Sequence, residues 1–366
     1  MSKTSASLPL SHPHAPLLSR RHFVATATMA GGSAALGLGL PLAARAAPKF
    51  PSVVNYAQIG EGKAEPGAVL RYNMGGFDLS KSLGGAKIDW KPGFPASLPV
   101  VEAMRAGAID FSFITSTALI YAIGGNVPLV PLVSYPLPAN EVDILVYPDS
   151  GIKTIQDLKG KRVADHRGTT STYSLVRSLE AAGMTLADIQ YVNLPGPDAA
   201  SAFANKRVDA WITWQPGAEL NVRRLNAVTL PGVKTYDYAF FVATEKFASE
   251  YPEAAAILAR TARDAQRYIE AKPDEVVAKF GELGGFGSNK LEQQIYLDLV
   301  KSSRLSFSGA GQLNLVDEKT ATDIQSLADS FYTLKIYPAK INVKEWMMDK
   351  RFEPVRRVVA QELAKS

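Results

Sequence analysis

Residues 159–184 read KGKRVADHRGTTSTYSLVRSLEAAGM, which predicts a tight turn, a short strand, a glycine and then a helix. The helix opens on four hydroxyl residues, Thr169, Thr170, Ser171 and Thr172. The first N–H groups of a helix have no partner within the helix, and the helix dipole is positive at this end. Because Gly168 lets the backbone approach a ligand closely and the hydroxyls add donors, this segment predicts a site for a small anion.

A later segment, residues 208–216, reads VDAWITWQP and resembles residues 109–115, which read IDFSFIT. In both segments a helix ends, a turn follows, and an aspartate, Asp110 or Asp209, stands near the start of a strand. Five residues after each aspartate comes Thr115 or Trp214, at the carboxyl end of the strand, where open α/β sheets place their ligands. The similarity is either a coincidence between two ordinary helix–strand units or a repeat, and a repeat implies two similar lobes that face one cleft.

The rest of the chain predicts an α/β fold, because strands alternate with helices as far as about residue 243. We expect strands or extended segments at residues 53–57, 109–114, 128–135, 142–147, 162–164, 191–194, 210–213 and 238–243. Within this part we expect a helix at residues 98–107. Beyond residue 246 the pattern is mostly helical, with helices expected at residues 252–272, 273–283, 290–303, 318–333 and 344–363.

The N-terminus predicts an export signal. It contains a twin-arginine pattern at Arg20-Arg21, an apolar run rich in alanine and glycine at residues 25–42, and an A-x-A cleavage site at Ala44-Arg45-Ala46. The alternative is a transmembrane anchor, but the glycines and the proline of this run make a poor spanning helix. We therefore expect residues 1–46 to be removed, and the mature chain to be a soluble periplasmic protein that crosses the inner membrane already folded.

The composition excludes several classes of protein. Cysteine is absent, which rules out disulfides, zinc–thiolate sites and thiol nucleophiles. The formal net charge is +5, but four basic residues lie within the first 46 residues, which contain no acid. The mature chain is therefore nearly neutral, and we expect no binding to nucleic acid. A chain of 366 residues, 46% of them hydrophobic, can bury a large core and normally divides into more than one lobe.

Three motifs together resemble the substrate-binding proteins of ABC importers for aliphatic sulfonates, nitrate and taurine. They are FPASLPVVEAMRAGAIDF at residues 94–111, KGKRVADHRGTTS at residues 159–171 and VDAWITWQP at residues 208–216. The resemblance covers about residues 53–243 and is weaker in the helical tail. It implies a two-lobed type II periplasmic-binding fold with a helical C-terminal extension.

The resemblance also implies a domain organisation and a mechanism. One lobe would consist of residues 47–135 and 236–366, the other of residues 136–235, and two extended crossings would form the hinge. The lobes would close around a small anion, such as an aliphatic sulfonate, and then dock on an inner-membrane permease that works with an ATPase. We expect a monomer that needs no cofactor and no metal.

The resemblance, together with the hydroxyl pattern, gives eleven candidate ligand-binding residues. They are Ser97, Thr115, Ser116, Thr117, Arg167, Thr169, Thr170, Ser171, Thr172, Trp214 and Gln215. Trp214 would flank the apolar part of the ligand. The hydroxyls at residues 115–117 replace the usual glycine–aspartate of the family, which suits an anion. Gln215 replaces the usual acid before proline, so a ligand with an ammonium group, such as taurine, is a poorer candidate than an unaminated anion.

Each of these candidates has a structural alternative. A hydroxyl residue at a helix start is often only an N-cap. A tryptophan in a strand is often a core residue, and Arg167 can equally be a solvated loop residue. His166 is the only histidine after the signal and has no visible partner, so we interpret it as a loop residue.

Two other functions stay open. An enzyme on the same fold is disfavoured. Sulfinate-cleaving enzymes and pyrimidine-precursor synthases of this fold rely on cysteine, or on cysteine and histidine clusters, whereas this chain has no cysteine and one histidine after the signal. A sensory module that presents its solute to a membrane receptor has the same sequence features as a transport protein. Within transport, the solute could be a sulfonate, nitrate, a carboxylate or an uncharged heterocycle.

Overall fold

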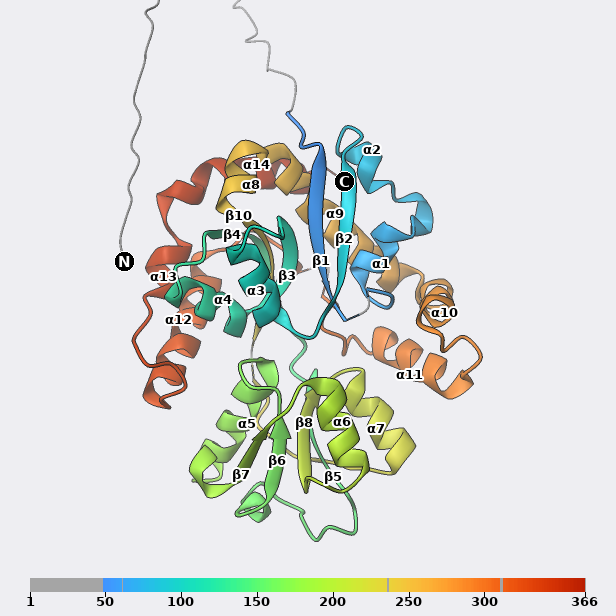
Figure 1. The fold of residues 1–366 in the computed structure, drawn as a ribbon, viewed down its shortest axis with the longest axis vertical. Helices are drawn as coiled ribbons and strands as arrows, with labels where there is room; N and C mark the ends of the chain where they lie inside the picture. The colour runs from blue at the N-terminus through green and yellow to red at the C-terminus, as the bar shows by residue number, and fades with distance from the viewer. Residues whose placement is uncertain (1–48, 61, 236, 310–311, 366) are drawn as a thin grey trace, which may run out of the picture. The chain divides into compact units, whose positions relative to one another are not determined.

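The computed structural model describes residues 49–60, 62–235, 237–309 and 312–365, and Figure 1 shows how its elements are arranged. The expected signal peptide at residues 1–46 lies outside these residues. The strands are β1 (Val53–Ile59), β2 (Lys87–Phe94), β3 (Phe111–Thr115), β4 (Leu129–Pro136), β5 (Val142–Val146), β6 (Arg162–Asp165), β7 (Gln190–Asn193), β8 (Ala210–Trp214), β9 (Val228–Leu230) and β10 (Tyr238–Thr244).

These strands form two five-stranded sheets with the same topology. The first sheet has the order β2-β1-β3-β10-β4 and the second has the order β7-β6-β8-β5-β9. In each sheet the first three strands are parallel, and the last two are joined by antiparallel pairing. We call the second sheet with helices α5, α6 and α7 the second lobe, and the first sheet with the remaining helices the first lobe (Figure 1).

The helices of the first lobe come from both ends of the described chain. Before the second lobe they are α1 (Pro66–Arg71), α2 (Leu79–Ser82), α3 (Ser97–Arg105) and α4 (Ser116–Gly124). After it they are α8 (Glu245–Glu250), α9 (Pro252–Ala271), α10 (Pro273–Gly284), α11 (Lys290–Lys301), α12 (Glu318–Thr333), α13 (Val343–Met347) and α14 (Glu353–Leu363). The helices of the second lobe are α5 (Thr170–Ala181), α6 (Gly196–Ala204) and α7 (Gly217–Leu225).

Each sheet separates two clusters of buried residues, which is the reason that its inner strands, such as β10, are largely apolar. In β10, which is buried along its whole length, Phe240 and Val242 belong to one core cluster, and Phe241 and Ala243 belong to the cluster on the opposite face. The second sheet likewise separates two clusters of buried residues. Among the described residues, we find no helix with the length and apolarity that a membrane span requires.

The sequence missed two strands and merged two helices. β2 and β9 lie at the edges of their sheets, where a strand needs no continuous apolar pattern, and β2 includes Pro92 and Gly93. The single helix expected at residues 344–363 is wrong, because the structure has α13 and α14 there, separated by a short 3-10 turn. The Asp349 carboxylate accepts a hydrogen bond from the backbone N–H of Arg351 at 2.9 Å, and α14 then begins with Pro354 in its first turn.

The repeat suggested by the sequence has a structural counterpart. The Asp110 carboxylate, just before β3, accepts hydrogen bonds at 2.8 Å from the backbone N–H and from the side chain of Asn55 in β1. The Asp209 carboxylate, just before β8, accepts a hydrogen bond at 2.8 Å from the backbone N–H of Arg162 in β6. Each aspartate therefore fixes the start of a central strand against its parallel neighbour.

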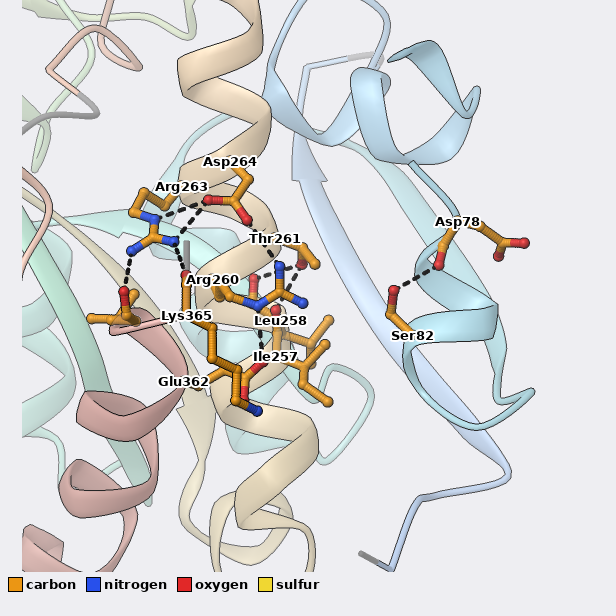
Figure 2. Close-up of polar contacts among 11 residues, drawn as sticks. Asp78, Ser82, Ile257, Leu258, Arg260, Thr261, Arg263, Asp264, Glu362 and Lys365 are labelled. Atoms are coloured by element: carbon orange, nitrogen blue, oxygen red, sulfur yellow. Dashed lines mark hydrogen bonds and ion pairs between the residues drawn. The ribbon is translucent and has the colours of Figure 1, made fainter. Parts of the chain in front are cut away.

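The C-terminal helix is fastened to the first lobe by two arginines of α9 (Figure 2). The Arg263 guanidinium, 5% exposed, donates to the carbonyl oxygens of Leu363 at 2.7 Å and Lys365 at 3.3 Å. Arg260 donates to the carboxylate of Glu362 at 2.8 Å. The bond from Arg263 to Leu363 satisfies a carbonyl oxygen that the end of α14 leaves without a helical partner.

Candidate functional site

A cavity of about 170 Å³ lies between the two lobes and is lined by residues of both. Many of the lining side chains are aromatic: Tyr56, Phe113, Tyr135, Trp214, Phe241, Tyr296 and Phe307. Phe113 and Thr115 lie on the same face of β3 because side chains alternate along a strand. The carboxyl ends of β3 and β8, at Thr115 and Trp214, both reach the cavity.

The cavity brings together six of the eleven candidate residues. They are Ser97, Thr115, Thr169, Thr170, Trp214 and Gln215. The remaining five, which are Ser116, Thr117, Arg167, Ser171 and Thr172, are absent from its lining. Their surroundings in the structure explain why.

Two helix starts, one from each lobe, contribute to the lining. α3 begins at Ser97 and α5 begins at Thr170, and the side chain of the N-cap residue, Ala96 or Thr169, does not cap either helix. Thr169 instead donates its hydroxyl to the carbonyl oxygen of His166 at 2.8 Å. The Ser97 hydroxyl accepts a hydrogen bond at 3.2 Å from the backbone N–H of Thr115, which ties the start of α3 to the end of β3. Uncapped N–H groups of two helices therefore lie beside the cavity.

The hydroxyls of Ser171 and Thr172 bind an internal carboxylate instead of facing the cavity. They donate to the two oxygens of Asp165 at 2.5 Å each, and Tyr191 donates to the same carboxylate at 2.6 Å. Asp165 is fully buried at the end of β6. Burial raises the pKa of Asp165, and the three hydroxyl donors oppose this shift only in part. The expected row of four hydroxyls is thus divided between the cavity and Asp165.

Ser116, Thr117 and Arg167 have other neighbours. The Ser116 hydroxyl donates to the carbonyl oxygen of Tyr238 and accepts from its backbone N–H, both at 3.0 Å, so it joins α4 to β10. Thr117 is 1% exposed, and its hydroxyl has no hydrogen-bond partner among the described residues. Arg167 is exposed, and its guanidinium lies 5.1 Å from the centre of the Tyr191 ring.

Trp214 and Gln215 follow each other at the end of β8 but have different roles. The Trp214 ring lines the cavity, and the His166 ring stacks against it with the ring centres 6.1 Å apart. The Gln215 side chain is 2% exposed, donates to Asp143 at 2.9 Å and accepts from the backbone N–H of Glu219 at 3.0 Å. Its amide is therefore already used within the second lobe.

Sequence reasoning missed two carboxyl groups at the cavity. Glu65 lies in the glycine-rich loop after β1 and accepts a hydrogen bond from Gln58 at 2.7 Å, and desolvation raises the pKa of Glu65 to about 7. Glu141 lies on the crossing from β4 to β5 and is 4% exposed. Burial, together with the nearby Asp237 carboxyl, raises the pKa of Glu141 to about 8. The position of Glu65 after a strand could have indicated the site, whereas Glu141 has no local sequence signal.

No lysine, arginine or histidine is among the described residues that line the cavity. Positive potential there comes from the backbone at the two helix starts, and negative potential comes from the faces of the aromatic rings. The cavity can therefore hold a hydrogen-bond acceptor or anion at the helix starts and an apolar group among the rings.

The two lobes contact each other at two places. At the first, a Cβ atom at Gly168, whose φ is +81° and which lines the cavity, would lie 2.6 Å from Cδ1 of Leu98 in the first lobe. At the second, Arg304, which follows α11, forms ion pairs with Asp143 at 3.1 Å and with Glu219 at 3.0 Å in the second lobe.

Comparison with known proteins identifies what this geometry is similar to. Residues 85–276 match the sequence model of a family described as NMT1/THI5 like. A protein of Escherichia coli K12, whose provisional name is aliphatic sulfonates-binding protein, is 28% identical over 270 residues, which cover 73% of this chain and 81% of that protein.

Two crystal structures of binding proteins have the same fold. The periplasmic aliphatic sulphonate binding protein SsuA from Escherichia coli matches with a TM-score of 0.66 and 24% identity, over 81% of this chain and 91% of SsuA. The alkanesulfonate-binding protein SsuA from Xanthomonas axonopodis pv. citri, bound to MOPS, matches with a TM-score of 0.69 and 22% identity. The match covers 81% of this chain and 97% of that protein. These matches confirm the expected two-lobed α/β periplasmic-binding fold, with its helical C-terminal region.

The raised pKa of Glu141 predicts a pH dependence of stability. The folded chain holds the Glu141 proton more tightly than the unfolded chain, whose pKa is near 4.5. This contribution to stability is fully present below the unfolded pKa and is lost as the pH rises towards 8. Between pH 5 and pH 8.5 the wild-type protein should lose about 1–4 kcal/mol of unfolding free energy relative to Glu141→Gln. Urea unfolding of both proteins measures the difference, and parallel pH profiles would contradict it.

Proposed function

Because the chain belongs to the NMT1/THI5-like family, we propose that it is the extracytoplasmic solute-binding component of an ABC importer. It captures a small anion, such as an aliphatic sulfonate, between its two lobes. The observation that carries this proposal is the cavity, which residues of both lobes line. The names of the relatives, which are sulfonate-binding proteins, support the class of solute.

The anionic group of the solute binds at the starts of α3 and α5. The side chain of the N-cap residue leaves the first N–H groups of both helices uncapped, and such groups, at the positive end of the helix dipole, bind anions without a basic side chain. Ser97, Thr115, Thr169 and Thr170 line the same cavity. Ser171 and Thr172 act indirectly, because their bonds to Asp165 hold the start of α5 in place.

The apolar part of the solute packs among the aromatic rings. Trp214 comes from the second lobe and Phe113 and Phe241 come from the first, so the rings of both lobes cover the solute when the lobes close. Burial of an alkyl chain among such rings contributes about 25 cal/mol for each Å² removed from water.

After capture, the closed protein delivers its solute to an inner-membrane permease and its ATPase, and it does so as a monomer without a catalytic step. The relatives named above are binding proteins, which supports a binding role at the level of the family. The chain acts in the periplasm, which it reaches by the twin-arginine route after removal of residues 1–46.

Melting temperatures in the presence of alkanesulfonates, nitrate, carboxylates and neutral heterocycles test the solute class. A solute at 100 times its Kd stabilises the folded chain by about 2.7 kcal/mol, so a true ligand raises the melting temperature clearly. We expect the alkanesulfonates to do so. Stabilisation by neutral heterocycles alone would contradict the proposed anion.

Paired variants at the start of α5 test the placement of the anion. Thr170→Val should lower the affinity for the stabilising anion by about 1–2 kcal/mol. Ser171→Ala, the matched control one residue away, should instead lower the free energy of unfolding, because it removes a donor from the buried Asp165. Calorimetry and urea unfolding on both variants measure the two quantities. The opposite pattern would move the anion away from α5.

The contact between Gly168 and Leu98 predicts that Gly168→Ala weakens binding, because the added methyl group obstructs closure. Gly151→Ala is the matched control: its φ is +75°, similar to that of Gly168, but no atom lies within 4 Å of the added group. We expect a loss of affinity only in Gly168→Ala, and partial recovery when Leu98→Ala is added. Equal affinities for the two single variants would show that closure does not depend on this contact.

The export route is tested by Arg20→Lys combined with Arg21→Lys. We expect the double variant to remain in the cytoplasm as the full-length precursor, because the twin-arginine pathway requires the arginine pair. Cell fractionation measures the distribution. Efficient appearance of the processed double variant in the periplasm would favour the general secretory route.

A further inference from the structure

Glu141 is a buried residue at the cavity, and one of its carboxyl oxygens has no hydrogen-bond partner among the described residues. Its backbone is fixed, since its N–H donates to the carbonyl oxygen of Pro138 at 3.0 Å and its carbonyl oxygen accepts from Gln215 at 2.8 Å. Glu141 lines the cavity, and 4% of the surface of the whole residue is exposed. The oxygen without a hydrogen-bond partner among the described residues is Oε2.

A buried carboxyl oxygen without a hydrogen bond is costly, and the neighbouring acidic group described below disfavours ionisation of Glu141. A buried polar group without a hydrogen bond destabilises a protein by about 1–3 kcal/mol, and a charged group by more. The neighbouring ionisable groups are Asp237, on the other crossing between the lobes, and Tyr135 at the end of β4; the negative charge of Asp237 opposes ionisation of Glu141. The Glu141 carboxyl is therefore suited to form a hydrogen bond or an ion pair with a solute that enters the cavity.

Glu141 differs in this respect from the other carboxyl group of the lining. The Glu65 carboxylate already accepts a hydrogen bond from Gln58, whose own side-chain oxygen accepts one from Arg71 at 3.4 Å. Glu65 therefore has an internal partner, and Glu141 is the acceptor that remains available. The aromatic rings around the cavity add negatively polarised faces that also favour a cation.

We propose that Glu141 binds a positively charged N–H group of the solute, so that the solute is a zwitterion with its anionic group at the starts of α3 and α5. The inference rests on the proposed function and narrows the class of solute from small anions in general to zwitterions. It also corrects the sequence-based argument against an ammonium group. That argument relied on the absence of an acid at Gln215, but the structure supplies an acid from the crossing at residue 141.

Taurine and ethanesulfonate test the proposal, because they share a sulfonate and a two-carbon chain and differ by the ammonium group. The mature wild-type protein should bind taurine at least about tenfold more tightly than ethanesulfonate in calorimetry. Glu141→Gln has nearly the same shape, lacks the negative charge and should lose this preference. Asp237→Asn is the matched control, because it removes a neighbouring buried carboxyl that does not line the cavity, and it should keep most of the preference.

Proton release gives a second measurement. The ammonium group favours the ionised form of Glu141, so binding of taurine near pH 7 should release protons, which calorimetry in buffers of different ionisation enthalpy detects. Binding of ethanesulfonate, or of taurine to Glu141→Gln, should release markedly fewer.

The outcomes separate the inference from the function on which it rests. If the wild-type protein binds ethanesulfonate as tightly as taurine, or if Glu141→Gln keeps the preference, the zwitterion proposal is overturned and an anion-binding importer component stands. The wild-type comparison needs no variant, so a poorly folded Glu141→Gln would not leave the proposal undecided. If neither sulfonate binds, and the carboxylate pair of β-alanine and propionate does not bind either, both the zwitterion and the proposed anion are overturned.

Discussion

Both sheets depend on one repeated interaction, in which the carboxylate of an aspartate just before the central strand accepts a hydrogen bond from a backbone N–H of the parallel strand beside it. Asp110 makes this bond to Asn55 and Asp209 makes it to Arg162. Because both central strands then run for five residues, their ends, Thr115 and Trp214, fall at matching edges of the two sheets. The cavity exists where these edges face each other, so the aspartates fix the geometry of a site from which they are remote.

The sequence predicted the parts of the fold in which local pattern and burial agree. Strands buried on both faces, such as β10, read as unbroken apolar runs, and the repeated aspartates at residues 110 and 209 pointed to two equivalent units. The edge strands β2 and β9 were not predicted, because they are partly exposed to solvent and therefore lack a continuous apolar pattern. The division between α13 and α14 depends on a turn stabilised by Asp349, which apolar periodicity alone does not reveal.

The site was less predictable, because helix geometry and chain crossings decide it. Successive residues of a helix point about 100° apart, so four consecutive hydroxyls at residues 169–172 cannot all face one cavity. Thr169 and Thr170 reach it, whereas Ser171 and Thr172 turn towards Asp165. Glu141 stands on an irregular crossing, and only the assembled lobes place its carboxyl at the cavity. The side chain of Gln215, although next to Trp214, is directed into the second lobe.

The interleaved order of the strands has a consequence for synthesis on the ribosome. The second sheet has all its strands once Leu230 has been made, but the first sheet lacks β10, which lies between β3 and β4, until Thr244. About 100 residues separate the end of β4 from β10, and at roughly 5–20 residues per second their synthesis takes about 5–20 seconds. During that interval β3 and β4 have unpaired edges, which are the surfaces through which nascent chains aggregate. The second lobe can thus complete its sheet before the first lobe receives its last strand.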